Sequence, residues 1–162
     1  ENGTMQLNLQ PEMIEDIFRE AIHHLGRNKR KHNISMHLED DLLMANMDAR
    51  LIIQVLVNLI NNAIKYTPEN SNISLNARRV EDKILIEVQD DGNGVLHPEQ
   101  LFEMFYTENN RSGDTRRGMG LGLSLCKSIV QSHGGTIWVE NVKPHGACFK
   151  FLLEAVEVKL YE

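Results

Sequence analysis

A chain of 162 residues, 41% of them hydrophobic, can bury one sizeable core and lies within the usual size of a single domain. Its net charge of −6 provides no basic field, which disfavours binding to nucleic-acid backbones. No apolar run approaches the roughly 20 residues of a membrane helix, so we expect no membrane contact by this chain.

The two cysteines, Cys126 and Cys148, both lie inside apolar stretches. This placement favours buried thiols in a reducing compartment over a disulfide framework, and we therefore expect a cytoplasmic domain. The first residues lack the basic and then apolar order of a signal peptide. Because the chain begins with Glu1, we expect it to be part of a longer protein in which any membrane anchor or sensor lies outside these residues.

The first predicted elements are a strand and an amphipathic helix. Residues 4–9 alternate between polar and apolar side chains, as a strand does, and Pro11 then opens a helical pattern that stops at Gly26. Two short strands are predicted next, at 32–39 and 42–47.

A long helix and a hairpin are predicted in the middle of the chain. Asp48 is the expected N-cap of a helix that ends before Pro68. The alternating segments 72–80 and 83–90 predict two strands joined by a tight turn. A short helix is expected at about 98–105.

The last part of the chain combines a polar loop, a helix and two strands. Residues 106–117 contain one aromatic and no aliphatic side chain, which predicts a mobile loop. A helix follows the glycines of 118–122 and stops at the pair 134–135, before strands at 135–142 and 147–158. Together, the elements predict an α+β two-layer sandwich, with a mixed, mainly antiparallel sheet covered on one face by helices.

The long helix carries an unusual polar stripe. From Leu51 to Ile64 it is nearly all apolar, and its polar positions fall on one face: Gln54, Asn58, Asn61 and Asn62, followed by Lys65. A solvent-exposed stripe is one interpretation, although exposed helix faces favour Glu, Lys and Arg over Asn. Two Asn at i and i+4 also present a pair of neutral oxygens, which suits Mg²⁺ when a bound phosphate brings the negative charge.

A carboxylate continues the apolar face of a predicted strand. Ile84, Ile86 and Val88 share one face, so Asp90 is expected to point into the core. Burial of a carboxylate is costly unless a group donates hydrogen bonds to it, and an adenine amino group is such a donor. The alternative is a simple turn, because Asp, Gly and Asn are common turn residues.

The glycines of GMGLGL (118–123) fit neither common nucleotide-binding pattern. Met119 stands where a P-loop requires Lys, and the residue after Gly122 is Leu123, which breaks G-x-G-x-x-G. Glycines at the start of a helix nevertheless leave backbone N–H groups free to bind an anion. A flexible entry to a packed helix is the alternative.

Taken in order, these segments resemble the ATP-binding catalytic domain of sensor histidine kinases, in the GHKL group that also includes gyrase-type ATPases, heat-shock chaperones and mismatch-repair ATPases. The resemblance covers about residues 40–155, and as an ordered set it is highly specific. Its parts are NLINNAIKYT (58–67) as the N box, DDGNG (90–94) as the first G box, LFEMFY (101–106) as the F box, GMGLGL (118–123) as the second G box, and HGGTIWVEN (133–141) with GACFKF (146–151) as closing strands. The segment GACF (146–149) is similar to the potassium-sensing, KdpD-like subgroup.

The resemblance implies that the chain binds ATP and Mg²⁺. It implies that Asn62 is the Mg²⁺ ligand with Asn58 assisting, that Lys65 and Tyr66 contact the nucleotide, and that Asp90 accepts a hydrogen bond from the adenine amino group. Further expected nucleotide contacts are Gly92 and Gly94 below the adenine, Phe105 at the base of an ATP lid, and Gly118, Gly120, Leu121, Gly122 and Leu123 beside the phosphates.

The expected lid is the loop 106–117, which carries three arginines. Arg111 is preferred as the contact to the γ-phosphate, with Arg116 and Arg117 as the other candidates. Ordinary solvated loop arginines are the alternative for each. The family often has Arg after the F box, where this chain has Thr107, so that contact is either absent or supplied by a lid arginine.

The implied activity is that of a protein-histidine kinase domain, with Asn58, Asn62, Lys65 and Arg111 as its catalytic residues. The phosphoacceptor pattern, a His followed by an acidic residue and a downstream Pro, is missing from the sequence. The γ-phosphoryl group would therefore pass to a histidine on a separate dimerisation domain, and then to a response regulator. We expect the isolated chain to be one monomeric catalytic domain, inactive in autophosphorylation.

Two other functions stay open at this point. One is an ATPase of the same group that uses hydrolysis to drive a conformational change; that class typically has a glutamate near the first Asn, and no acidic residue lies between Gln54 and Lys65. The other is a degenerate module that binds nucleotide, or only a partner protein, without transfer.

Overall fold

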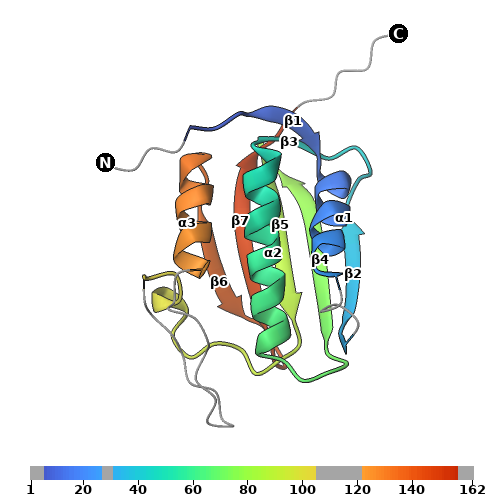
Figure 1. The fold of residues 1–162 in the computed structure, drawn as a ribbon, viewed down its shortest axis with the longest axis vertical. Coiled ribbons are helices and arrows are strands. Elements are labelled where there is room, and N and C mark those ends of the chain that lie inside the picture. The colour runs from blue at the N-terminus through green and yellow to red at the C-terminus, as the bar shows by residue number, and fades with distance from the viewer. Residues whose placement is uncertain (1–5, 27–30, 105–121, 157–162) are drawn as a thin grey trace.

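Five strands form one mixed sheet, and the α-helices cover one of its faces (Figure 1). The structure is a computed structural model that describes residues 6–26, 31–104 and 122–156. Across the sheet the strands lie in the order β2 (Asn33–Leu38), β4 (Asn72–Val80), β5 (Lys83–Asp90), β7 (Ala147–Glu154) and β6 (Ile137–Asn141). Only β2 pairs with its neighbour in parallel; the other pairs in this sheet are antiparallel. The predicted α+β sandwich is confirmed.

A second, two-stranded sheet lies at one end of the molecule (Figure 1). In it, β1 (Gln10–Met13) pairs antiparallel with β3 (Met44–Met47). The chain then enters α1 (Ile14–His24), which Figure 1 shows beside α2 (Ala49–Lys65). The third α-helix, α3 (Gly122–Ser132), flanks α2 on the other side.

The core lies between the helices and the sheet, because each helix turns its apolar stripe inward. In α1 the stripe is Ile14, Ile17, Phe18 and Ala21, and its acidic first turn and histidine-bearing last turn complement the helix dipole. The facing strand positions are apolar with period two, for example Ile84, Ile86 and Val88 in β5. Burial of each large aliphatic side chain contributes about 1.5–3 kcal/mol relative to leaving it exposed.

The predicted beginning of the chain is wrong. Residues 6–9 form no strand, and Leu9 is half exposed, so the alternation there marks no buried face. The strand lies at Gln10–Met13, and α1 begins at Ile14 rather than at Pro11. Pro11 is tolerated in β1 because this short strand pairs only with β3 in the part of the chain that the structure describes, and an edge strand can lose a donor.

The remaining predicted elements occur near their expected positions. Asp48 is the N-cap residue of α2, although its side chain makes no capping hydrogen bond. The predicted helix at 98–105 is shorter than expected: the described part is a single 3₁₀ turn, η2 (Pro98–Gln100), followed by turn residues up to Met104. The predicted loop at 106–117 lies outside the described residues. None of the described helices is long and apolar enough to cross a membrane.

Candidate functional site

Two cross-helix contacts set α2 and α3 in an antiparallel register. Near the start of α2, the backbone N–H of Asp48 donates to Nε2 of His133 at 3.0 Å. Two turns further along α2, the Cys126 thiol donates to the carbonyl of Val55 at 3.8 Å. Each step covers seven residues in both helices, so Leu59 is level with Gly122, Asn58 with the first turn of α3, and Asn62 lies about one turn beyond the start of α3. The amide stripe thus passes the start of α3.

Asn58 lies against α3 through the Cys126 side chain. Burial raises the pKa of the Cys126 thiol to about 12, and a hydrogen bond from the Asn58 side chain opposes part of that shift. The thiol is therefore neutral at physiological pH and acts as a fixed neighbour of the amide.

The polar face of α2 is graded in exposure. Gln54 and Lys65 are exposed, whereas Asn58, Asn61 and Asn62 are half buried. The opposite side of the helix is fully buried and includes Leu56, Leu59 and Ile60. The predicted stripe is confirmed as a face, and its central amides are too enclosed for an ordinary solvated surface.

Asp90 ends β5 with its side chain buried, at 8% exposure. Its Oδ1 accepts hydrogen bonds from the backbone N–H of Gly92 at 2.9 Å and of Ala147 at 3.3 Å. The period-two pattern of β5 therefore placed this carboxylate correctly. Two backbone donors help to stabilise the buried charge and hold the start of the following loop.

Gly92 lies in close contact with the residues that follow α2. A Cβ atom at this position would lie 2.7 Å from the Thr67 methyl carbon, 3.2 Å from Asp90 Oδ1 and 3.5 Å from the Tyr66 carbonyl oxygen. A methyl group does not fit there without displacing a neighbour. The first G box and the end of the N box, predicted separately, are thus in contact.

Gly94 lies in the same loop at a positive φ of +84°, where a Cβ would lie 2.5 Å from Asn141 Oδ1. The Asn141 side chain forms a pair of hydrogen bonds with Val95: its Oδ1 accepts from the backbone N–H at 2.8 Å, and its Nδ2 donates to the carbonyl at 3.0 Å. The loop after β5 is therefore fixed to the end of β6, and Gly94 permits that approach.

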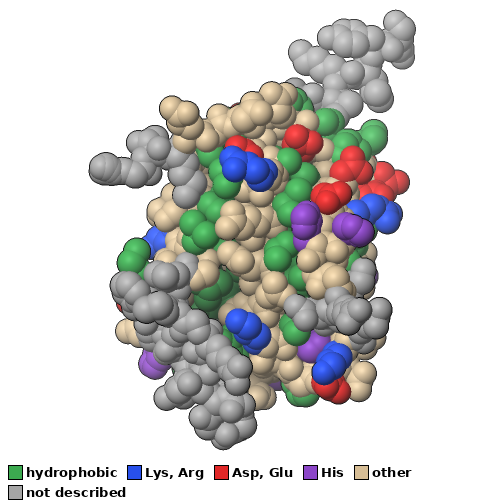
Figure 2. Space-filling view, in the orientation of Figure 1, with side chains coloured by type: hydrophobic (Ala, Val, Ile, Leu, Met, Phe, Trp, Pro, Cys, Tyr) green, Lys and Arg blue, Asp and Glu red, His purple; other side chains and the backbone are tan. Residues whose placement is uncertain are grey.

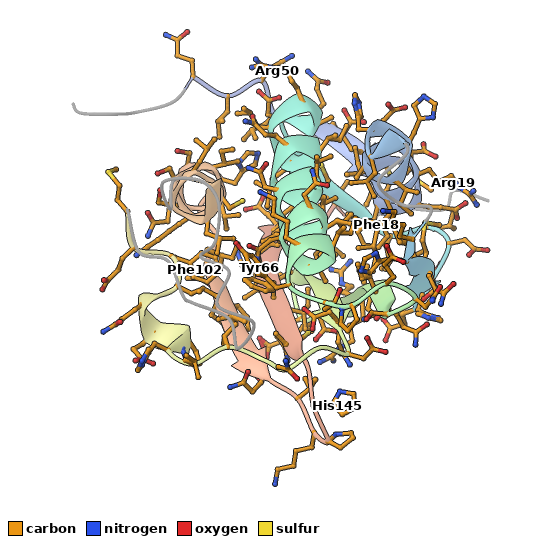
Figure 3. The ribbon with its side chains drawn as sticks, turned by 60° about the horizontal axis from the view of Figure 1, so that its bottom comes forward. Phe18, Arg19, Arg50, Tyr66, Phe102 and His145 are labelled. Carbon is orange, nitrogen blue, oxygen red and sulfur yellow. The ribbon has the colours of Figure 1, made fainter. Side chains whose placement is uncertain are left out.

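Tyr66 lies at the C-terminal end of α2, as Figure 3 shows. Its backbone N–H donates to the Asn62 carbonyl at 3.3 Å, and its side chain is half buried. Phe102 of the F box is buried and packs edge-on against Phe149 of β7, with ring centroids 6.0 Å apart. The F box therefore anchors the chain that leads toward residue 105.

At the start of α3, Gly122 is exposed and Leu123 packs partly against the core. Their placement fits the predicted entry to the helix. The other predicted nucleotide contacts lie outside the described residues: Phe105, Arg111, Gly118, Gly120 and Leu121.

Sequence reasoning missed Thr67, Asn141 and His32. Asn141 was detectable, because Ile137, Val139 and Asn141 share one face of β6, by the same period-two argument that identified Asp90. Thr67 and His32 bear no such pattern. Their importance depends on a contact between segments that are distant in the sequence.

The described residues include no cluster of metal-ligating side chains, and on the helix-bearing face they form no basic patch (Figure 2). No group of three or more His, Cys, Asp or Glu side chains there could hold a metal ion. On the helix-bearing face in Figure 2, the Lys and Arg side chains drawn in colour are scattered. A metal at this site would depend on amide oxygens and on the charge of a bound ligand.

Comparison with known proteins identifies relatives of the whole arrangement. The family model "Histidine kinase-, DNA gyrase B-, and HSP90-like ATPase" matches residues 47–157. The sensor protein KdpD of Clostridium acetobutylicum is 35% identical over 153 residues, covering 93% of this chain and 17% of that protein. The adaptive-response sensory kinase SasA of Synechocystis sp. is 35% identical over 158 residues, covering 94% of this chain and 40% of that protein. The chain thus spans less than half of these relatives, and the first bears out the resemblance to the KdpD-like subgroup.

Solved structures show the same fold. The catalytic domain of histidine kinase ThkA matches with a TM-score of 0.79 at 28% identity, covering 91% of this chain and 97% of that domain. ThkA in complex with response regulator protein TrrA matches with a TM-score of 0.78 at 28% identity, covering 93% of this chain and 42% of that one. With a family match over more than half of its length, the chain belongs to the histidine kinase-, DNA gyrase B- and HSP90-like ATPase family, an ATP-binding family in which its matched relatives are sensor kinases.

Proposed function

We propose that this domain binds Mg-ATP and donates the γ-phosphoryl group to a histidine on a separate dimerisation domain of a two-component sensor kinase. One observation carries the proposal: the half-buried amides Asn58 and Asn62 lie at and just beyond the start of α3, and the residues that follow them at the end of α2 contact the loop that holds the buried carboxylate of Asp90. A polar site for phosphates and a recessed acceptor for a nucleobase thus lie at the same end of the molecule.

The phosphate end of the site is formed by α2 and α3. Backbone N–H groups at a helix N-terminus favour anions, and Gly122 begins α3 without a side chain in the way. Lys65, exposed one turn beyond Asn61, supplies a point charge for the phosphates. We assign the neighbouring Gly118, Gly120, Leu121 and Leu123 to the same end, and Arg111 to the γ-phosphate.

The base end of the site is formed around Asp90. Its carboxylate would accept a hydrogen bond from the adenine amino group, while Gly92 and Gly94 let the loop pack closely against Thr67 and Asn141. Tyr66 at the end of α2 would contact the nucleotide from the other side, with Phe105 at the base of the lid.

The donor set fits Mg²⁺ delivered with a nucleotide. Asn62 would hold the ion, with Asn58 assisting, and both are neutral oxygen donors. The pair provides no net charge, so affinity for the free ion should be weak and affinity for the Mg-ATP complex stronger. When bound, Mg²⁺ neutralises charge on the phosphates during transfer.

The transfer requires little chemistry from this domain. The bond between the γ-phosphorus and the β,γ-bridging oxygen breaks, a bond to an imidazole nitrogen of the acceptor histidine forms, and ADP leaves. The residues of this chain bind and orient the nucleotide, which is the dominant requirement in phosphoryl transfer. The acceptor histidine and its dimerisation domain would be separate partners. A response regulator is the next partner proposed, since the related ThkA has been solved with one.

The compartment that we propose is the cytoplasm. Both cysteines are free and buried, which suits a reducing environment.

A calorimetric titration with a non-hydrolysable ATP analogue, with and without Mg²⁺, tests the site. We expect Mg²⁺ to strengthen binding, Asp90→Asn to weaken it at least about ten-fold, and Asn62→Ala to abolish the Mg²⁺ enhancement. Gln54→Ala is the matched control, because Gln54 lies on the same face two turns away and is exposed. Absence of binding to the folded wild-type domain would refute the proposal.

A second assay tests the transfer. Radiolabelled ATP, this domain and a supplied histidine dimerisation domain should yield labelled phosphohistidine, which a response regulator then discharges. Steady ATP hydrolysis without phosphohistidine would indicate the ATPase alternative. Nucleotide binding with neither product would indicate a degenerate binding module.

A further inference from the structure

We propose that His32 is a positioning residue for the nucleobase end of this site, acting through the hydroxyl of Thr67. The inference rests on the proposed ATP binding and deepens it. His32 belongs to no predicted motif and lies far from the N box in sequence, yet the two side chains are joined at 2.9 Å between Nε2 and Oγ1.

The backbone around His32 is fixed to the segment that follows α2. The Asn70 N–H donates to the Lys31 carbonyl, and the Asn33 N–H donates to the Ser71 carbonyl at 2.9 Å. These bonds hold the start of β2 beside residues 70–71, which follow α2 in the chain. His32 itself is buried, at 8% exposure.

The hydrogen-bond pattern determines which ring nitrogen carries the proton. Thr67 Oγ1 donates its single hydrogen to the Ala63 carbonyl at 2.7 Å, so toward His32 it can only accept. Nε2 of His32 must therefore be protonated. Its Nδ1 is buried and has no hydrogen-bond partner among the described residues, so a proton there would be costly. His32 thus donates from Nε2 to Thr67.

Thr67 transmits this constraint to the loop after β5. Its hydroxyl is held from two sides, by Ala63 and His32, which selects one of its staggered rotamers. In that rotamer the Thr67 methyl lies against Gly92, where a Cβ would approach it to 2.7 Å. Gly92 in turn donates its N–H to Asp90 at 2.9 Å. His32 therefore supports the wall beside the carboxylate that we assign to adenine.

The test is a double-mutant cycle read by nucleotide affinity. His32→Phe keeps an aromatic ring and removes the donor, and Thr67→Val keeps the methyl group and replaces the hydroxyl by a second methyl. We expect His32→Phe to weaken ATP and ADP binding equally, about five-fold, since one net hydrogen bond is at stake and it lies at the base end. In the Thr67→Val background, His32→Phe should cause no further loss, because the two side chains act as one unit.

Conservative variants separate positioning from general stability. His32→Gln retains a side-chain N–H and should restore most of the affinity. His37→Phe is the matched control: His37 is an exposed histidine on β2 that bonds only Ser35 among the described side chains, and its replacement should leave affinity unchanged. Thermal unfolding of each variant shows whether it is folded. If His32→Phe does not fold, Thr67→Val tests the same hydrogen bond, because it removes the acceptor instead of the donor.

Several outcomes would overturn the inference. The first is an unchanged affinity for ATP in folded His32→Phe, or in Thr67→Val if His32→Phe does not fold. The second is a loss of affinity in the double variant that equals the sum of the two single losses. The third is an affinity of His32→Gln no higher than that of His32→Phe. If the wild-type domain binds no ATP, the proposed function fails and this inference fails with it. If the wild type binds normally and the His32 variants do too, only this inference fails.

Discussion

His133 joins the two helices of the site at the end remote from the nucleotide. Its Nδ1 donates to the Ile129 carbonyl at 2.8 Å, which leaves Nε2 to accept the backbone N–H of the buried Asp48 at 3.0 Å. The ring thus connects the C-terminal turn of α3 to the N-cap of α2, and it helps to fix the register in which Asn58 lies level with the start of α3.

Replacing His133 by Phe should therefore destabilise the fold. The Asp48 N–H would lose its acceptor while staying enclosed, at a cost of about 1–3 kcal/mol in the free energy of unfolding. Urea denaturation measures this loss. His24→Phe is the control, because His24 is exposed on α1 and should change stability by less than about 0.5 kcal/mol. Equal effects of the two substitutions would contradict the assigned role of the ring.

Gly92→Ala should impair nucleotide binding, and a second substitution should repair it. The new methyl would overlap the Thr67 methyl carbon at 2.7 Å, and Thr67 cannot easily turn away because its hydroxyl is held. Overpacking of this kind costs about 1–3 kcal/mol in the free energy of unfolding, and displacement of the loop that holds Asp90 should also lower the affinity for ATP. Thr67→Ser removes the methyl and retains the hydroxyl, and the double variant should recover most of the affinity. A double variant no better than Gly92→Ala would show that the clash is elsewhere.

Asn141→Ala should loosen the loop that follows β5. It removes both hydrogen bonds to Val95, of which each contributes about 0.5–1.5 kcal/mol. We expect a several-fold loss of ATP affinity with a smaller change in unfolding free energy. Asn93→Ala is a suitable control, because Asn93 is an exposed residue of the same loop. If the control lowers affinity as much as Asn141→Ala does, the loop is not positioned by Asn141.

Alkaline pH should weaken the fold through its thiols. The pKa of Cys126 is raised from 9.0 to about 12 by burial, so the folded state keeps a proton that the unfolded chain releases above pH 9. Fewer bound protons in the unfolded state mean that stability falls as pH rises, by up to about 1.4 kcal/mol per pH unit between pH 9 and 12. Cys126→Ala removes this contribution. The difference in unfolding free energy between the wild type and the variant should therefore become smaller as the pH rises from 9 to 12.

Cys148 provides a parallel case on the sheet. Burial, and then the neighbouring Glu87, raise the pKa of its thiol to about 12. Denaturant unfolding should show that the difference in unfolding free energy between the wild type and Cys148→Ala also becomes smaller between pH 8.5 and 10.5. A gap independent of pH in both variants would indicate that the thiols ionise as readily in the folded protein as in the unfolded chain.

Most of the fold was predictable because its elements carry strong periodicity. The inward position of Asp90 followed from Ile84, Ile86 and Val88 alone, and Asp48 as the N-cap residue followed from residue type. The start of the chain was not predictable, because Pro11 is compatible with the first turn of a helix and also with an edge strand. Only pairing with β3 decides between them.

The site was predictable as separate segments and not as a set of contacts. The amides of α2 and the glycines after β5 were identified from local patterns. The contact of Asn58 with Cys126, and that of Thr67 with Gly92, join segments distant in sequence and require the packed structure. Local periodicity contains no information about which helix faces which loop.

The parallel pairing of β2 with β4 has a consequence for the order of folding. The β4 and β5 strands are joined by Glu81 and Asp82 and can pair locally, whereas β3 and α2 separate β2 from β4 in the chain. Local pairs form first because they close short loops, so β2 should dock after the β4–β5 hairpin has formed. Its backbone amides should therefore exchange with solvent sooner than those of β5. Since His32 lies immediately before β2 and contacts Thr67, a bound nucleotide should slow that exchange, and amide exchange in β2 would report occupancy of the site.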